Sequence, residues 1–143
     1  MNIFKSIDDK LNEFAKKHNA GIYTREIRGI NEPIDETEIR TIYWSERKFD
    51  YAILIFPHTS YGYRTSDLWD ITIHSSLVEN GDVTGEIPFW TKDLLKGVPF
   101  PEIERQIDHL LAESEKLLSA VRVEDMRLDW FYLDGKLVDN RIK

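Results

Sequence analysis

Three stretches of strand-like sequence follow one another closely in the middle of the chain, over residues 38–46, 50–57 and 67–78. Each stretch either alternates apolar and polar residues or is continuously apolar, and all three are rich in β-branched and aromatic side chains. The segments that join them are shorter than the crossover of about a dozen residues that parallel strands require. We therefore expect consecutive strands to pair antiparallel, with a tight turn over Ser45–Asp50.

Helical spacing precedes this region. Apolar residues recur every three or four positions from Ile3 to Phe14, which predicts an amphipathic helix over 3–18. Asn19 and Gly21 end it, because both accept the left-handed conformation found after helices. Further strands are expected at 22–28 and 82–87, separated from their neighbours by an acidic loop at 29–38 and a turn at Asn80–Gly81.

Helical spacing returns after residue 90. Thr91 is a suitable cap for a short helix over 92–96 that Gly97 ends. Pro101 suits the first turn of a longer helix near 101–122. The segment "RLDWFYLDGKLVDN" predicts a closing hairpin that turns at Asp134–Gly135. The apolar stripe of the long helix consists of Ile103, Ile107, Leu110, Leu111, Leu117, Leu118 and Val121.

The order of these elements predicts the fold class. Helices come before and after a block of strands instead of alternating with them, which is typical of α+β proteins. We expect a two-layer domain with a mostly antiparallel sheet of about five to seven strands. The N-terminal helix and the long helix near 101–122 should pack on one face. At 143 residues the chain suits a single α+β domain over 1–143.

The turns suggest which residues share a face of the sheet. Pairing Trp44 with Tyr51, and Phe56 with Trp69, divides the three central strands into two sets. The set expected beneath the helices is Ile39, Thr41, Tyr43, Ala52, Leu54, Phe56, Trp69, Ile71 and Ile73. The set expected on the other face is Arg40, Ile42, Trp44, Tyr51, Ile53, Ile55, Asp70, Thr72 and His74.

This second face has an apolar, aromatic middle and a polar rim, a composition typical of interfaces. Three occupants are consistent with it: the closing hairpin or the short helix of the same chain, a partner protein, or a second copy of the chain. The loop "HTSYGYRT" is either an ordinary hairpin connection or an adaptable binding loop. The candidate partner-binding residues are Arg40, Ile42, Trp44, Tyr51, Ile53, Tyr61, Tyr63, Arg64, Asp70 and His74.

Charge and composition exclude several classes of function. The net charge of −7 repels phosphate backbones, which argues against nucleic-acid binding. The chain has no cysteine, which rules out disulfides and thiolate sites and fits a reducing compartment. The longest apolar run, "YAILIF", is far shorter than the roughly 20 residues that span a bilayer. We expect a soluble, cytoplasmic, acidic protein without membrane contact.

No pattern of catalytic or metal-ligating residues emerges. His58 and His74 are expected roughly 23 Å apart along neighbouring strands, too far to share a metal ion or a proton. The chain has no nucleophile elbow and no phosphate loop. We therefore predict no catalytic residues, no metal and no cofactor, and a non-catalytic protein–protein interaction or adaptor domain. It would bind another protein or a second copy of itself. The alternative is a small-molecule-binding protein or minor enzyme with a pocket between sheet and helices.

Overall fold

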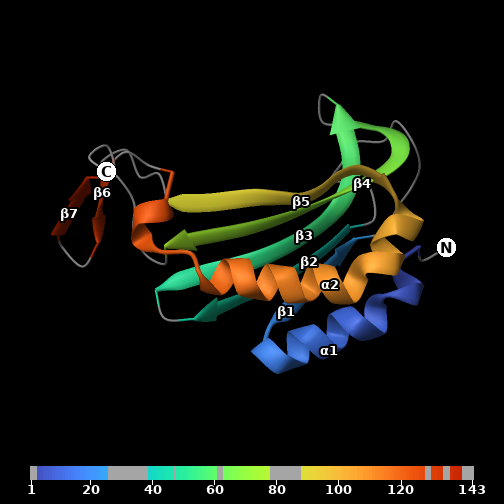
Figure 1. Cartoon of the computed structure of the whole chain (residues 1–143), viewed down its shortest axis with the longest axis horizontal. Helices are drawn as coiled ribbons and strands as arrows, with labels where there is room; N and C mark the ends of the chain where they lie inside the picture. Colours follow the sequence, from blue (N-terminus) through green and yellow to red (C-terminus); the bar gives the residue numbers. More distant parts are fainter. Residues whose placement is uncertain are drawn as a thin grey trace.

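The computed structural model of the chain describes residues 3–25, 39–46, 48–60, 63–77, 88–127, 130–133 and 136–139. It has the expected α+β architecture, with two layers: a five-stranded antiparallel sheet and two helices on one of its faces (Figure 1). The elements in chain order are η1 (Ile3–Ser6), α1 (Asp8–His18), β1 (Gly21–Arg25), β2 (Ile39–Glu46), β3 (Phe49–Ser60), β4 (Tyr63–Leu77), β5 (Phe89–Pro99), α2 (Phe100–Ser119), η3 (Val123–Asp125), β6 (Trp130–Leu133) and β7 (Lys136–Asp139).

Strands β1 to β5 lie in the sheet in their order along the chain, and each pairs antiparallel with the next. The predicted N-terminal helix, long helix and closing hairpin are confirmed; β6 and β7 form a separate two-stranded sheet. Helix α1 ends where the sequence predicts, because Asn19 adopts the left-handed conformation with φ of 53°. The prediction that β2, β3 and β4 pair antiparallel is confirmed, and it depends only on the short connections between them.

The prediction of which face the helices cover is wrong. The register between β2 and β3 is as expected, with Trp44 opposite Tyr51. Strand β4, however, pairs with β3 one residue away from the predicted register, so that Trp69 lies opposite Pro57. A shift of one residue moves every side chain of a strand to the other face. The buried side chains of β4 thus join the Ile42 and Ile53 side of the sheet, and the helices pack there.

The cause of this shift is an irregularity near the end of β3. The β3–β4 ladder continues to Ser60 and Tyr63, well beyond the predicted strand ends, and its register changes between Pro57 and Thr59. Between these two pairs one residue of β3, at position 58, faces four residues of β4, at positions 65–68. An irregularity of this kind leaves residues of one strand without a partner on the other. Counting residues back from the turn therefore gives the wrong pairing for the whole of β4.

The short helix predicted over 92–96 is also wrong, because these residues belong to strand β5. Pairing with β4 supplies their backbone hydrogen bonds and overrides the local preference for helix. The register of β5 shifts on both sides of Ile71, which makes its pattern irregular. The strand predicted at 82–87, the turn at Asn80–Gly81, the turn at Asp134–Gly135 and the loop at 29–38 lie outside the described residues.

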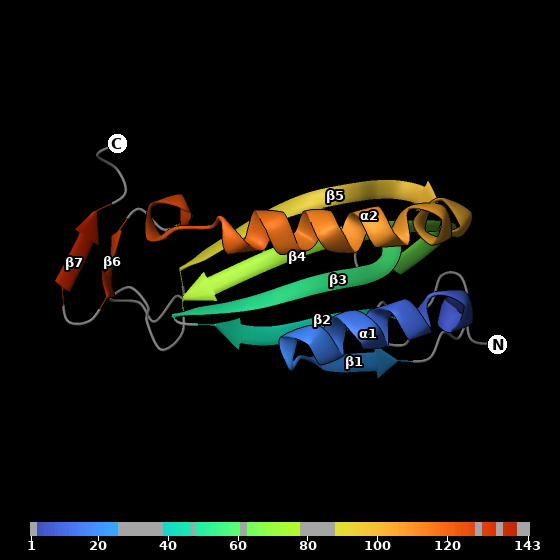
Figure 2. The same ribbon diagram turned by 60° about the horizontal axis from the view of Figure 1, so that its bottom comes forward.

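Helices α1 and α2 lie side by side and run in the same direction (Figure 2). Their contacts repeat at a constant separation of 98 residues: the Ser6 hydroxyl donates to Glu104, and the Lys10 ammonium lies 2.6 Å from the Asp108 carboxylate. Farther along, the Glu115 carboxylate lies 2.9 Å from the Lys17 ammonium group and 2.7 Å from Nε2 of His18. Exposed ion pairs of this kind contribute about 0–1 kcal/mol each, so they align the helices more than they hold them.

An aromatic cluster joins η1, β4 and α2 beneath the helices. The ring of Phe4 lies 5.4 Å from that of Trp69 and 5.3 Å from that of Phe100, in edge-to-face contacts. Phe4 and Trp69 are both fully buried. Phe4, in η1, is therefore part of the core. Other core residues with almost no exposure are Ile7, Leu11, Ile42, Ile53, Ile55, Ile71, Ile73 and Ile103.

Arg40 is buried in this layer and connects β2 to the start of α1. Its guanidinium forms a two-pronged contact with Asp8, with N–O distances of 3.0 and 3.2 Å, and it lies 4.3 Å above the Phe4 ring. Another guanidinium nitrogen donates to the Ile39 carbonyl. A buried arginine needs such compensation, because an unpaired charge in the core is costly. The contacts of Arg40 within the fold therefore explain why this arginine is buried.

Ser75 is another buried polar residue. It is fully buried, and its hydroxyl makes no hydrogen bond within the described part of the chain. Burying an unpaired hydroxyl is unfavourable. We expect Ser75→Ala to raise the free energy of unfolding by about 0.5–1 kcal/mol. Urea denaturation of both proteins would measure this, and a loss of stability would show that the hydroxyl has a partner.

Candidate functional site

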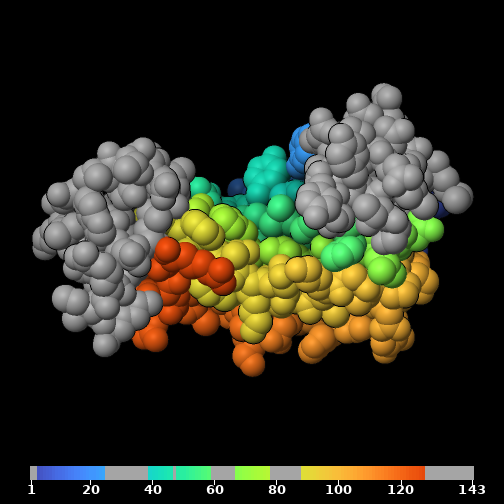
Figure 3. Space-filling model, turned by 90° about the horizontal axis from the view of Figure 1, so that it is seen from above, coloured from blue at the N-terminus to red at the C-terminus, as the bar shows by residue number. Residues whose placement is uncertain are grey.

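The face of the sheet opposite the helices, here called the open face, is the candidate site. Figure 3 looks at this side and shows atoms of β2 to β5 at the surface, with α2 along one edge. Its large side chains are not covered by described residues: Tyr23 is 47% and Tyr43 is 53% exposed. Its described members are Gly21, Tyr23, Thr41, Tyr43, Ser45, Asp50, Ala52, Leu54, Phe56, Asp70, Thr72, His74, Ser76, Phe89, Thr91 and Asp93.

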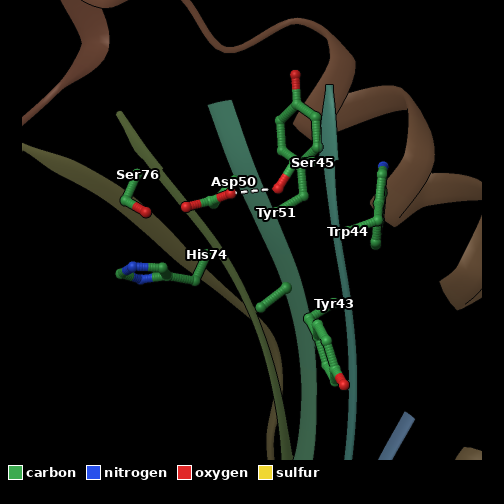
Figure 4. A pocket seen from close by; sticks show the side chains of 8 residues that line it. Tyr43, Trp44, Ser45, Asp50, Tyr51, His74 and Ser76 are labelled. Carbon is green, nitrogen blue, oxygen red and sulfur yellow. Dashed lines mark hydrogen bonds between the residues drawn. The ribbon is translucent and has the colours of Figure 1, made fainter. Parts of the chain in front are cut away.

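A hollow lies in the middle of the open face, with Ala52 as its floor. Tyr43 and His74 lie directly opposite Ala52 on the two neighbouring strands. Tyr43 leans away from it over Gly21, where even a Cβ atom would approach the tyrosine ring to 2.4 Å. His74 leans the other way and stacks on Phe89, with ring centroids 5.7 Å apart. Two large side chains thus tilt away from a small one and leave a space of about 380 Å³ (Figure 4).

The next row of the sheet gives this hollow a polar end. Ser45, Asp50 and Ser76 lie opposite one another on β2, β3 and β4. The Ser45 hydroxyl donates a hydrogen bond to the Asp50 carboxylate. In Figure 4 the other carboxylate oxygen of Asp50 is directed toward Ser76. The hollow therefore has aromatic walls, a methyl floor and one carboxylate with free acceptor capacity.

His74 is half-buried, and this burial lowers the pKa of its imidazole below the usual value. The unfolded chain then takes up a proton more readily than the folded chain as the pH falls below about 6.5. The contribution of His74 to stability is intact above that pH and is lost as the pH falls toward the lowered pKa.

We therefore expect the stability difference between the wild type and His74→Gln to be constant above about pH 7.5 and to change below about 6.5, with the wild type losing more. Urea denaturation across this range measures it. A difference that stays constant down to about pH 5 would show that the imidazole is not desolvated by folding.

A second polar group lies at the far end of the open face. The Asp70 carboxylate is buried, accepts a 2.7 Å hydrogen bond from the Gly97 backbone N–H, and lies 3.0 Å from Nδ1 of His58. Register shifts of β4 occur here: His58 lies at the shift in the β3 pairing, and Asp70 lies at the first of the two shifts in the β5 pairing. The side chains thus replace ladder contacts that the bulges remove.

This arrangement favours the tautomer with Nδ1–H toward the carboxylate, and Nε2 of His58 makes no hydrogen bond to a described residue. A histidine oriented in this way occurs in hydrolase triads and beside metal ions. Neither use finds support in the described part of the chain. Within those residues no group of three or more histidine, aspartate or glutamate side chains could hold a metal ion. The pair is accounted for by its role at the bulges.

The candidate partner-binding residues separate into three groups. Five of them are buried beneath the helices, with 1–7% exposure: Arg40, Ile42, Trp44, Tyr51 and Ile53. Of these, Trp44 and Tyr51 also border the hollow (Figure 4). Asp70 and His74 both lie on the open face, His74 beside the hollow in its middle and Asp70 four residues away toward one end. Tyr61 lies outside the described residues, and so do the side chains of Tyr63 and Arg64, whose backbone belongs to β4.

Sequence reasoning missed Tyr43, Asp50 and Ala52, and it missed the His58–Asp70 contact. The sequence pattern places Tyr43 and Ala52 on the helix-covered face and Asp50 in a turn. A signal for them exists, since the predicted pairing of Tyr43 with Ala52 is correct and an alanine between a tyrosine and a histidine leaves room for a hollow. The His58 contact depends on two bulges, and nothing in the sequence pattern indicates them.

No family model, curated protein or solved structure matches this chain. In the described part of the chain no helix is both long enough and apolar enough to cross a membrane.

Proposed function

We propose that this chain is a non-catalytic interaction domain that binds another protein through the open face. The observation that carries the proposal is the exposure of aromatic side chains in the middle of that face, Tyr43 above all. An antiparallel sheet with one solvated face is expected to be polar there. Exposed tyrosines together with the partly exposed Leu54 and Phe56 are instead typical of protein interfaces.

Charge favours a different protein over a second copy of the chain. Each copy carries a net charge of −7, so two copies repel one another at a distance. A partner with a basic surface is attracted instead, and complementary charge accelerates its association. We therefore propose a basic protein partner.

The alternative of an enclosed small-molecule site has less support. One gap between the sheet and the helices, bordered by His18, Trp44 and Tyr51, has a volume of about 30 Å³. That volume suits water and not a metabolite. The hollow on the open face is larger, but it is a depression in an exposed surface, whereas ligand pockets bury about 70–90% of a small molecule. An extended partner surface fits it better.

The test is affinity capture from the source cells with three tagged proteins. Leu54→Asp places a charge in the open face, and Ala112→Asp places the same charge on the exposed side of α2. The wild type and Ala112→Asp should retain the same partner, and Leu54→Asp should lose it at least about tenfold, as expected for a charge at the centre of an interface. Equal retention by Leu54→Asp would contradict the proposal.

A further inference from the structure

We infer that the partner inserts an arginine side chain into the hollow above Ala52, with its guanidinium against Asp50 and beside Tyr43. The inference rests on the proposed function, and it specifies the chemistry of the partner at this site.

The charges around the hollow select a cation. Of the described residues that line it, Asp50 is the one carboxylate and none is a lysine or arginine. Burial lowers the pKa of His74, which leaves this imidazole neutral at pH 7 and without repulsion for a cation. The net charge of −7 acts in the same direction over a longer range.

Asp50 is oriented to receive a donor. Its contact with the Ser45 hydroxyl holds one oxygen, while Figure 4 shows the other directed toward Ser76 at the edge of the hollow. Within the described residues, Asp50 makes no ion pair. A carboxylate held in this way loses little freedom when a cation binds, and charged hydrogen bonds are the stronger ones.

Arginine fits this site better than lysine. Its guanidinium is planar, binds a carboxylate through two parallel N–H groups and stacks on aromatic rings. Tyr43 offers such a ring at the wall of the hollow and is 53% exposed. Arginine is also weakly hydrated and enriched among the residues that dominate binding energy at interfaces. The ammonium group of a lysine would interact less well with the face of the Tyr43 ring, and it would not bind both carboxylate oxygens of Asp50 in this parallel geometry.

The test uses two peptides, acetyl-Gly-Arg-Gly-amide and the same peptide with neutral citrulline in place of arginine. Backbone NMR shifts of the ¹⁵N-labelled full chain are followed as each peptide is added. We expect the arginine peptide to shift the resonances of Tyr43, Ala52 and Ser76 and to bind at least about tenfold more tightly than the citrulline peptide, because a charged hydrogen bond is lost in the latter.

Two matched variants locate the effect. Asp50→Asn removes the negative charge at the hollow, whereas Asp93→Asn removes a negative charge elsewhere on the same face. The two positions are matched because each carboxylate accepts a hydrogen bond from a hydroxyl group, Asp50 from Ser45 and Asp93 from Thr72. Asp50→Asn should weaken binding of the arginine peptide at least about tenfold, and Asp93→Asn should leave it within about twofold of the wild type.

Equal binding of both peptides, or wild-type affinity in Asp50→Asn, would overturn the inference. Its failure is distinguishable from failure of the proposed function. A partner that Leu54→Asp releases and Asp50→Asn retains would leave the open face as the interface and exclude the arginine at the hollow.

Discussion

Ile53→Asp should unfold the protein, while Leu54→Asp, one residue later, should leave it folded. Ile53 is 2% exposed and packs beneath the helices, so an aspartate there buries a charge without a partner. Substitutions of that kind belong to the most damaging class, at about 4 kcal/mol or more. Leu54 faces the other way and is partly exposed. An aspartate in its place should cost about 1 kcal/mol, mainly through its poor preference for strands.

Circular dichroism and urea denaturation of both variants measure the contrast. Because natural domains are stable by about 5–15 kcal/mol, Ile53→Asp should lose most of its cooperative transition. The reverse result, with Leu54→Asp unfolded and Ile53→Asp folded, would mean that the helices cover the opposite face of the sheet.

Phe4→Ala should lower the free energy of unfolding by about 3–5 kcal/mol, the range for large aromatic residues removed from a core. Phe4 is fully buried, contacts Trp69 and Phe100 and lies under the Arg40 guanidinium. Its removal leaves a cavity and also takes a ring contact from a buried charge. The substitution therefore tests whether η1 is part of the core.

The matched control is Tyr43→Ala, which removes an aromatic ring from an exposed position and should change stability by less than about 1 kcal/mol. Urea denaturation followed by tryptophan fluorescence suits both variants, since the chain has four tryptophans. A loss below about 1 kcal/mol in Phe4→Ala would show that η1 packs only loosely on the sheet.

The fold class could be predicted because its signals are local. Short connections indicate antiparallel pairing, and the apolar period of residues 3–18 and 101–122 indicates two amphipathic helices. Strand β5 could not be predicted, because residues 92–96 are helical in local preference and their pairing with β4 is a tertiary effect. The sequence shows the local preference of these residues for helix, but it does not show the pairing with β4 that overrides this preference.

The candidate site could be predicted only in part, because it depends on one register. The pairing of Tyr43 with Ala52 follows from a tight turn, but the position of His74 depends on the bulge near His58. With a period of two, an error of one residue exchanges the core and the surface. Arg40, Trp44 and Tyr51 illustrate the consequence, since aromatic and charged residues that suggest an interface also build this core.

The open face as the site of partner binding is tested most directly by site-specific photo-crosslinking in the source cells. A benzophenone amino acid replaces Tyr43 in one protein and the exposed His109 of α2 in another. We predict a crosslinked species at position 43, absent at position 109, that contains a second, basic protein. Adducts of equal yield at both positions, or an adduct at 43 composed of two copies of this chain, would contradict the account.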